Sequence, residues 1–252
     1  MSDIYDPRKS SVDIASVNTD RFVHSTFPTH GQIPCEDGDL SLDGVSGKGA
    51  ALRLDFMDPA GSMTGQLLPT GSPVDSVQLP DGRIITLSCI DAANPFVFVP
   101  LDQVGLDHTV TLAELSHPVL VADLMMIRAL ASIKMGLATN LVDAARCMGT
   151  PKIALVGPSP DLENDIIIRA FSMGKPHPTI QMTGAVCVGA ASAVPGSVVN
   201  SIVQGKEAVV IGHAGGSMVV TGRADCSGPM PEIISGSVYR TARRLMEGSI
   251  IL

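Results

Sequence analysis

The stretch from His177 to Asn200, HPTIQMTGAVCVGAASAVPGSVVN, constrains the fold more than any other part of this chain. Thr183 and Gly184 lie at a predicted strand-to-helix turn. The helix expected after them, residues 185–193, contains only Ala, Val, Gly, Ser and one Cys. Such a helix is thin enough to lie inside a closed sheet, where its first backbone N–H groups would point at a buried position suited to an anion. Close packing alone explains the same small residues, and both interpretations stay open at this point.

The composition favours a β-rich domain with an aliphatic core. Hydrophobic residues make up 45% of the 252 residues, whereas aromatic residues make up 3%. The 25 glycines and 18 prolines indicate many turns between short strands. The formal net charge of −8 and the lack of a basic cluster argue against nucleic acid or an anionic membrane as a partner. An anionic small molecule remains compatible, since a site can be locally positive in an acidic protein.

The cysteine and histidine patterns and the first residues predict a cytoplasmic protein without a metal site. The five cysteines are widely spaced and form no CxxC pair, which is typical of free thiols in a reducing compartment. No two histidines have the spacing HxH or HxxxH, so we expect no metal site. The first ten residues are polar and lack the hydrophobic segment of a signal peptide, and the longest apolar run is too short to span a bilayer.

Short apolar runs between turn signals predict most of the strands. The Asp81-Gly82 pair between two of these runs predicts a hairpin turn. Many short strands around one thin helix predict an α+β fold with a helix inside a partly closed sheet. The expected strands are residues 21–25, 51–56, 76–79, 84–89, 96–99, 152–156, 165–171, 208–212 and 217–221.

The remaining segments give helices and irregular ends. Thr111 followed by Glu114 resembles a capping box, and apolar residues recur at helical spacing over residues 118–135. A second helix is expected over residues 140–148, ending before a glycine. Residues 1 to 18 are expected to be irregular. The tail, residues 238–246, is compatible with either helix or strand.

Two turn residues are candidate ligands of a carboxylate. Asn94 lies in the segment DAANPFVFV, residues 91–99, where its side-chain amide could be offered to a ligand. From this segment alone, we favour an Asn that caps its own turn. Thr70 lies in the segment GQLLPTG, residues 65–71, where ligand contact and a purely structural turn are both compatible with the sequence, and spacing favours the turn.

Three further features favour a structural interpretation. Cys187 lies about one turn into the thin helix, so it should point into the packing as a buried, inert thiol. His213 stands alone in a Gly-rich turn, where a histidine is more often structural than a base or ligand. Arg240, Arg243 and Arg244 form by default a solvated face, with a carboxylate clamp as the alternative for one of them.

Several stretches together resemble the PrpF-type isomerase family, within the diaminopimelate-epimerase-like superfamily. Its members include 2-methylaconitate cis-trans isomerase, methylitaconate and aconitate isomerases, and 4-oxalomesaconate tautomerase. Several of the matching stretches are long and unusual in composition, which makes the resemblance specific. In family order, they are LDFMDPAGSMTGQLLPTG (54–71), DAANPFVFV (91–99), IRALASIKMGL (127–137), PKIALVGP (151–158), the opening stretch (177–200) and RTARRLMEG (240–248).

The resemblance implies an α+β fold of the diaminopimelate-epimerase type, in which a barrel-like sheet surrounds a central helix. It also implies that the first of two such domains is largely missing. Residues 1–84 would be the last strands of the N-terminal domain, and residues 85–230 the complete C-terminal domain. Residues 231–252 would return to the N-terminal domain. The thin helix would be the central helix of the C-terminal domain.

The resemblance further implies where a substrate binds. The superfamily's catalytic cysteine at the start of this helix is replaced here by Met182-Thr183-Gly184, so this half offers no cysteine acid or base. The general base and acid are expected in a Lys-containing segment and a Cys-Gly-Asn turn, and this sequence contains no Cys-Gly-Asn. The catalytic residues are therefore unknown. The substrate-binding residues that the resemblance implies are Thr70, Asn94, Met182, Thr183, Gly184 and Ala185.

The implied activity is a cofactor-independent isomerase of small unsaturated di- or tricarboxylates, which removes a proton near a carboxylate and returns it elsewhere. Because the expected base and acid are missing, we expect this chain to bind polycarboxylates weakly and to turn over little. The alternative is a non-catalytic remnant or pseudoenzyme, acting as a binding or oligomerisation module such as a homodimer. An amino-acid racemase or epimerase is a weaker third interpretation, because that chemistry needs paired cysteines.

Overall fold

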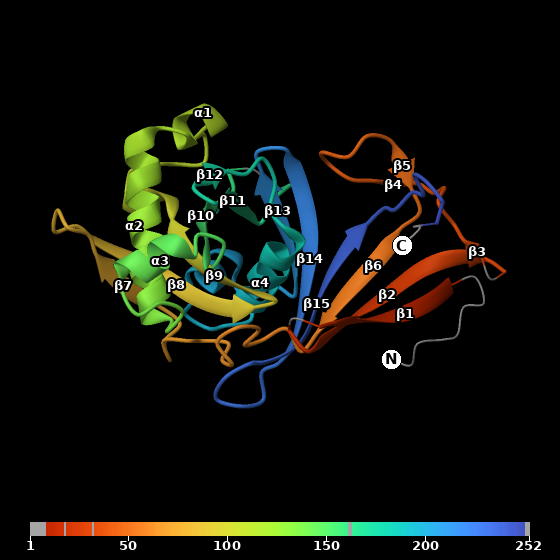
Figure 1. Ribbon diagram of the computed structural model, residues 1–252, viewed down its shortest axis with the longest axis horizontal. Coiled ribbons are helices and arrows are strands. Elements are labelled where there is room, and N and C mark those ends of the chain that lie inside the picture. Colours follow the sequence, from red (N-terminus) through yellow and green to blue (C-terminus); the bar gives the residue numbers. More distant parts are fainter. Residues whose placement is uncertain (1–8, 18, 32, 161–162, 250–252) are drawn as a thin grey trace.

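The structure is a computed structural model that describes residues 9–17, 19–31, 33–160 and 163–249. Figure 1 shows the helices gathered on one half of the molecule and the strands β1, β2, β3 and β6 on the other. The strands are β1 (Lys9–Ser16), β2 (Arg21–His30), β3 (Ile33–Pro34), β4 (Leu40–Ser41), β5 (Lys48–Gly49), β6 (Leu52–Met57), β7 (Asp75–Gln78), β8 (Ile84–Ala92), β9 (Asn94–Pro100), β10 (Lys152–Pro158), β11 (Ile166–Ser172), β12 (Lys175–Pro176), β13 (Ala208–His213), β14 (Gly216–Asp225) and β15 (Glu232–Arg240). The helices are the 3-10 helix η1 (Leu101–Val104), α1 (Leu112–Leu115), α2 (Pro118–Lys134), α3 (Leu141–Arg146), α4 (Met182–Ser192) and α5 (Val198–Val203).

One mixed sheet organises the chain and closes around α4. Its main path runs in the order β1-β2-β6-β15-β14-β13-β11-β10-β9-β8-β7. The pairs β9–β10 and β11–β13 are parallel, and the other neighbours on this path are antiparallel. An antiparallel bridge between Ala60, just after β6, and Ala92 in β8 joins the two sides of the curved sheet. The strands from β8 to β15 therefore form a barrel-like wall.

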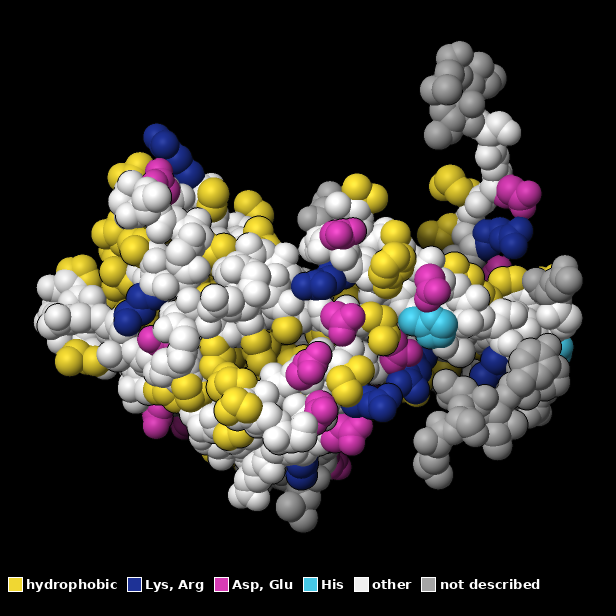
Figure 2. All heavy atoms as spheres, turned by 90° about the horizontal axis from the view of Figure 1, so that it is seen from below, with side chains coloured by type: hydrophobic (Ala, Val, Ile, Leu, Met, Phe, Trp, Pro, Cys, Tyr) yellow, Lys and Arg dark blue, Asp and Glu magenta, His cyan; other side chains and the backbone are white. Residues whose placement is uncertain are grey.

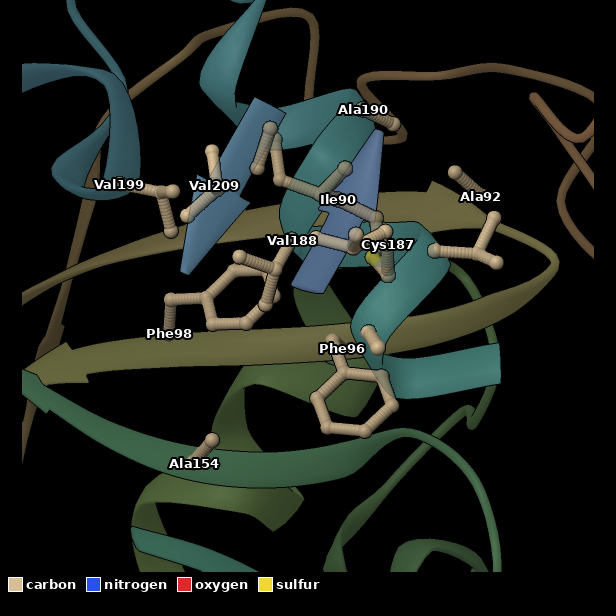
Figure 3. Packing of buried hydrophobic residues seen from close by; sticks show 14 of the residues in the cluster. Ile90, Ala92, Phe96, Phe98, Ala154, Cys187, Val188, Ala190, Val199 and Val209 are labelled. Atoms are coloured by element: carbon tan, nitrogen blue, oxygen red, sulfur yellow. The ribbon is translucent and has the colours of Figure 1, made fainter. Parts of the chain in front are cut away.

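Helix α4 lies inside this wall because its side chains are small. Every residue from Gly184 to Ser192 is buried. A Cβ added to Gly236 of β15 would lie 2.5 Å from a methyl of Val186, so glycine lets the strand approach the helix. Figure 3 shows Cys187, Val188 and Ala190 of α4 packed among residues of β8 and β9. The predicted thin, buried helix is confirmed, although it begins at Met182 rather than after the turn at Thr183–Gly184.

Strands β8 and β9 are mainly apolar and are buried from Leu87 to Ala92 and from Pro95 to Val99, because both faces of the sheet are covered there. Phe96 and Phe98 point into the α4 core with their ring centroids 5.6 Å apart. Val97 and Val99 point to the opposite face, which α2 covers with Leu124 and its neighbours. Two hydrophobic cores thus lie on the two faces of one sheet, and α2 forms the outer layer of the barrel (Figure 1).

Most of the predicted local structure is confirmed. The Asp81-Gly82 turn joins β7 to β8, and Gly82 has a φ of +91°. The Thr111 side chain accepts from the Glu114 N–H, and the Glu114 side chain bonds back to the Thr111 N–H, which is a complete capping box. Helix α2 ends at Lys134, and Gly136, two residues later, has a φ of +72°.

The two ends of the chain differ from the predictions. The described residues 9–16 form strand β1 rather than irregular structure, because they pair with β2 from Lys9–Pro28 to Ser16–Arg21. Residues 1–8 lie outside the described residues. The tail is a strand only up to Arg240, after which residues 241–249 have no regular structure. The expected domain boundary after residue 84 follows the first residue of β8 and stays a prediction.

The sheet face turned away from α4 is polar where β1, β2 and β6 meet. His24 Nδ1 lies 2.7 Å from an Asp13 carboxylate oxygen, and Arg53 contacts Asp55 at 2.8 Å. Ser237 also donates to Asp55. Asp13, His24, Arg53 and Asp55 line a cavity of about 500 Å³. Figure 2 shows one face of the molecule, on which charged side chains of both signs gather near the middle and hydrophobic side chains lie mainly to one side.

Candidate functional site

The start of α4 presents backbone N–H groups at one end of the barrel. Gln181 is the N-cap residue, and its side chain makes no capping hydrogen bond. The Ala185 N–H donates to the Gln181 carbonyl oxygen at 2.9 Å, so it closes the first helical turn. This N–H is thus used within the helix, and the expected contact of Ala185 with a substrate stays a prediction. The N–H groups of Met182, Thr183 and Gly184 precede this bond, where helix geometry provides no intrahelical acceptor.

Asn94 lies at the same end of the barrel. It begins β9, and Phe96, two residues later, meets the helix start: a Cβ on Gly184 would lie 2.6 Å from Phe96 Cζ. Figure 3 shows the first turn of α4 close to Phe96, on the side where β8 turns into β9. The turn itself is made by Ala93, with a φ of +58° and an N–H that donates to the Pro59 carbonyl at 2.7 Å. No described residue hydrogen-bonds to the Asn94 side chain, so the structure does not show the self-capping turn favoured from the sequence.

A buried aspartate fixes this turn in place. Asp91 is completely buried at the end of β8. Its carboxylate accepts hydrogen bonds from the backbone N–H groups of Met63 and Thr64 at 2.9 and 2.7 Å, and from the Ser62 hydroxyl at 2.5 Å. The loop after β6 is thereby held against the β8–β9 turn. The segment DAANPFVFV contains Asp91, but the sequence did not predict that its partners are Ser62, Met63 and Thr64.

Lys152 is a candidate site residue that sequence reasoning missed. It begins β10 and pairs with Phe96 of β9, on the same strand face as Ala154, whose side chain points into the α4 core. Its Nζ donates to Ser172 Oγ at 3.4 Å, and it forms no ion pair with a described carboxylate. Burial lowers the pKa of Lys152 below its usual range. A half-buried ammonium without an acid partner thus lies beside the strand that supports the start of α4.

The β13–β14 hairpin also reaches this end of the barrel. The Gly215 N–H donates to the Pro178 carbonyl at 2.7 Å, just before α4, and contacts His213 Nδ1 at 3.2 Å. Burial lowers the pKa of His213, despite the opposing charge of Asp43, so the imidazole is neutral near pH 7. In the tautomer that accepts this N–H, the ring proton is on Nε2. His213 is therefore a fixed neutral group, in line with its expected structural role.

The arginines of the tail separate into two environments. Arg240 is half-buried at the end of β15, and burial lowers its pKa. Arg243 and Arg244 are exposed, and Arg244 contacts Glu247 at 3.1 Å and Glu36 at 3.9 Å. Arg243 and Arg244 fit the expected solvated face. Arg240 lies close enough to His213 for its positive charge to contribute to the lowered pKa of that imidazole.

Thr70 and Cys187 take structural positions. The Thr70 hydroxyl donates to Asp75 at 2.6 Å and closes its own turn. The same loop reaches the end of β8, where the Asp91 N–H donates to the Leu67 carbonyl at 2.9 Å. The expected contact of Thr70 with a substrate stays a prediction. Cys187 is completely buried, and burial raises the pKa of its thiol, which confirms the expected inert residue.

The part of the chain that the structure describes holds no group of three His, Cys, Asp or Glu side chains arranged for a metal ion. Within the same residues, no helix combines the length and the hydropathy needed to cross a bilayer. Neither the polar-face cavity nor the larger cavity at the far ends of β9 and β10 reaches Asn94 or Thr183. The start of α4 thus offers backbone hydrogen-bond donors, and the half-buried Lys152 lies on β10, the neighbour of the strand that contacts this helix start.

Two solved structures show which proteins share this fold. A crystal structure of a probable proline racemase from Agrobacterium radiobacter matches 95% of this chain with a TM-score of 0.55 at 14% identity, which shows a likeness of fold. A crystal structure of methylitaconate-delta-isomerase matches 97% of this chain and 66% of that chain, with a TM-score of 0.87 and 30% identity. The mixed sheet with few helices is thus a fold shared by racemases and isomerases.

The chain belongs to the PrpF protein family, because the model of this family matches residues 5–252. It is 33% identical to the putative isomerase YraM of Bacillus subtilis over 96% of this chain, and 32% identical to a 2-methyl-aconitate isomerase of Shewanella oneidensis over 95%. It is 31% identical to a 3-methylitaconate isomerase of Eubacterium barkeri over 95% of this chain. The resemblance seen in the sequence motifs is confirmed. The chain spans 65–66% of the length of these relatives.

Proposed function

We propose that this protein acts in the isomerisation of small unsaturated di- or tricarboxylates, and that the start of α4 holds a substrate carboxylate. Relatives named as 2-methyl-aconitate and 3-methylitaconate isomerases support the substrate class. The observation that carries the proposal is Lys152, a half-buried cation without a carboxylate partner among the described residues, next to the strand under the helix start.

Electrostatics favours an anion at this position. The N-terminus of a helix carries about half a positive charge, which is unfavourable next to a second cation. A half-buried ammonium also loses part of its hydration, which lowers the pKa of Lys152. A carboxylate bound between Lys152 and the N–H groups of Thr183 and Gly184 would relieve both penalties. The amide of Asn94 would donate from the adjacent turn.

The chemistry that this arrangement serves is charge stabilisation. Removing a proton next to a carboxylate, or one double bond away from it, spreads negative charge onto the carboxylate oxygens. Fixed donors aimed at those oxygens lower the barrier by about 3 kcal/mol each. In this proposal the reaction needs no cofactor. We assign no general base or acid to the described residues, and we expect the 252-residue chain to bind polycarboxylates weakly with little turnover.

Calorimetric titration with tricarballylate, a saturated tricarboxylate that cannot isomerise, tests the binding step. We expect saturable binding, with amide resonances of Thr183 and Gly184 shifting, and at least tenfold weaker binding of acetate. Equal affinity for the two ligands would overturn the carboxylate site. Turnover is measured separately by NMR with cis-aconitate and 2-methylaconitate, and rapid turnover would refute the expected low activity while supporting the substrate class.

A second candidate function, an oligomerisation module, is favoured by strand β1. Among the described strands, β1 ends the sheet path and has an open edge, and Val12 and Ile14 are 50% and 49% exposed. Open, apolar edge strands pair readily with other chains. Sedimentation velocity distinguishes this candidate: a concentration-dependent dimer that Val12→Lys abolishes supports it, and a monomer at all concentrations contradicts it.

A further inference from the structure

A second cavity, separate from the α4 site, lies at the opposite ends of β9 and β10. Its volume is about 540 Å³, within the range of roughly 300–1,000 Å³ typical of small-molecule sites. Because β9 and β10 are parallel, their last residues meet at one edge of the sheet. Pro158 in the cavity wall is six residues from Lys152, or about 20 Å along the strand. The two sites therefore do not overlap.

The wall of this cavity is apolar and belongs to the protein core. Leu101, Val156 and Val198 line it, although their relative exposures are only 4%, 0% and 8%. A ligand here would contact side chains that are otherwise shielded from water. Water in such a space finds few hydrogen-bond partners, so an apolar group displaces it favourably. The apolar lining residues are Val74, Pro100, Leu101, Leu106, Val156, Pro158, Val198 and Ile202.

The wall is also rigid. Pro100 and Pro158 end the two strands that form it, and a Cβ on Gly157 would lie 2.8 Å from Leu101 Cδ1. On the other side, helix α5 is fixed by the Ser197 hydroxyl, which donates to the Ala191 carbonyl at 2.8 Å. The cavity is therefore a preformed feature between η1, β10 and α5.

The ionisable groups that line the cavity are the carboxylates of Asp102 and Asp107 and the imidazole of His108. Asp107 accepts hydrogen bonds from the Thr109 hydroxyl and N–H at 2.6 and 2.8 Å, and these hold its pKa below the usual range. Asp102 is exposed at the mouth and pairs with no described cation. No Lys or Arg lines the cavity. Arg169 approaches from outside, but its guanidinium donates to the carbonyl oxygens of Ile168 and His108.

From these observations we propose that this cavity binds a small apolar molecule with a primary amine, the apolar body between η1 and α5 and the ammonium at Asp102 and Asp107. The two aspartates disfavour the carboxylates that the α4 site would hold. The cavity is thus a second site with the opposite charge preference. This proposal does not depend on the isomerase function, because neither its residues nor its ligand take part in that reaction.

The test uses three eight-carbon probes that differ in charge: octylamine, octanol and octanoate. Each is titrated into the 252-residue chain below its aggregation concentration, with calorimetry and with the methyl resonances of Val156, Val198 and Ile202 as readouts. We expect saturable 1:1 binding of octylamine, with these methyl groups shifted, and at least tenfold weaker binding of octanoate. No saturable binding, or equal affinity for octylamine and octanoate, would overturn the proposal.

Two variants with remote controls locate the site. Ser201→Phe places a ring in the cavity and should abolish octylamine binding, whereas Ser227→Phe on an exposed loop should leave it unchanged. Asp102→Asn should weaken octylamine at least threefold and leave octanol unchanged, whereas Asp39→Asn should affect neither. Thermal unfolding of each unliganded variant verifies folding. Unchanged octylamine affinity in a folded Ser201→Phe protein contradicts the assigned position.

Discussion

Gly189 of α4 and Gly222 of β14 pack backbone against backbone: a Cβ on Gly222 would lie 2.2 Å from the Gly189 carbonyl oxygen. The helix can approach the strand this closely because neither residue has a side chain. This contact explains how a closed sheet of this size surrounds a helix. It also identifies where the fold tolerates no added atom.

The first prediction follows from this contact. Gly222→Ala should lower the free energy of unfolding by about 1–3 kcal/mol, because the new methyl group must displace backbone atoms rather than a flexible side chain. Gly228→Ala is the control, since its Cβ would meet only the Met230 carbonyl oxygen at 3.5 Å. Urea unfolding followed by circular dichroism measures both. A loss below 0.5 kcal/mol for Gly222→Ala would contradict the described contact.

Arg128 gives a second prediction, because its side chain extends from α2 and hydrogen-bonds to α3 and the residues after it. It is 3% exposed, and its guanidinium donates to the carbonyl oxygens of Ala144, Cys147 and Thr150 at 2.5, 3.1 and 3.3 Å. Arg128→Met keeps an apolar stem but leaves these acceptors without a donor, so the free energy of unfolding should fall by about 2–4 kcal/mol.

The control for Arg128→Met is Arg146→Met, since the Arg146 side chain is 76% exposed. Its removal should change the free energy of unfolding by less than about 0.5 kcal/mol. Both variants are measured by urea unfolding at pH 7. Equal effects of the two substitutions would show that the buried hydrogen bonds do not stabilise α3.

Asp165 gives a prediction about acid stability. Burial would raise its pKa, but hydrogen bonds from Lys206 and from the Val210 N–H, the latter 2.8 Å long, outweigh burial and lower it. A carboxyl whose pKa is lower in the folded state stabilises the protein above its unfolded pKa, about 3.9, and loses that contribution as pH falls through the folded value.

Asp165→Asn should therefore cost about 1–2 kcal/mol of unfolding free energy at pH 7. The difference from the parent protein should shrink below about pH 4, where the parent carboxyl becomes protonated. Urea unfolding between pH 3 and 7 measures this difference, with the exposed Asp39→Asn as control. A difference that is constant with pH would show that the charge of Asp165 is not responsible.

The sequence predicted local structure well where one segment carried its own signal. The small residues of α4, the Asp81-Gly82 turn and the capping box at Thr111 needed no distant partner. Strand β1 was missed because KSSVDIAS is polar and exposed, and it becomes a strand only by pairing with β2.

The candidate site was only partly predictable. Asn94 and Thr183 stand in unusual motifs, whereas Lys152 looks like any lysine at the start of a strand. Lys152 differs from an ordinary surface lysine because it pairs with Phe96, is half-buried and forms no ion pair with a described carboxylate. These properties depend on the tertiary structure and are not visible in the sequence. The sequence placed the helix start after the Thr183–Gly184 turn, whereas the helix begins at Met182, so the Ala185 N–H already lies within the first turn.

Lys152 supplies the last prediction, which separates binding from folding. Lys152→Met should weaken tricarballylate binding at least tenfold, because the ammonium charge at the helix start is lost. The free energy of unfolding should stay equal or rise slightly, since a half-buried cation with no acid partner is removed. Lys175→Met, on the exposed strand β12, is the control and should keep full affinity.

The pH dependence tests the same residue. Because burial lowers the pKa of Lys152, the unfolded chain holds its proton to a higher pH than the folded chain does. The stability of the parent protein should therefore rise as pH increases from the folded pKa toward the usual value, about 10.4, and tricarballylate affinity should fall over the same interval. Lys152→Met should abolish both trends. If it keeps the affinity and its pH dependence, the bound carboxylate does not contact Lys152.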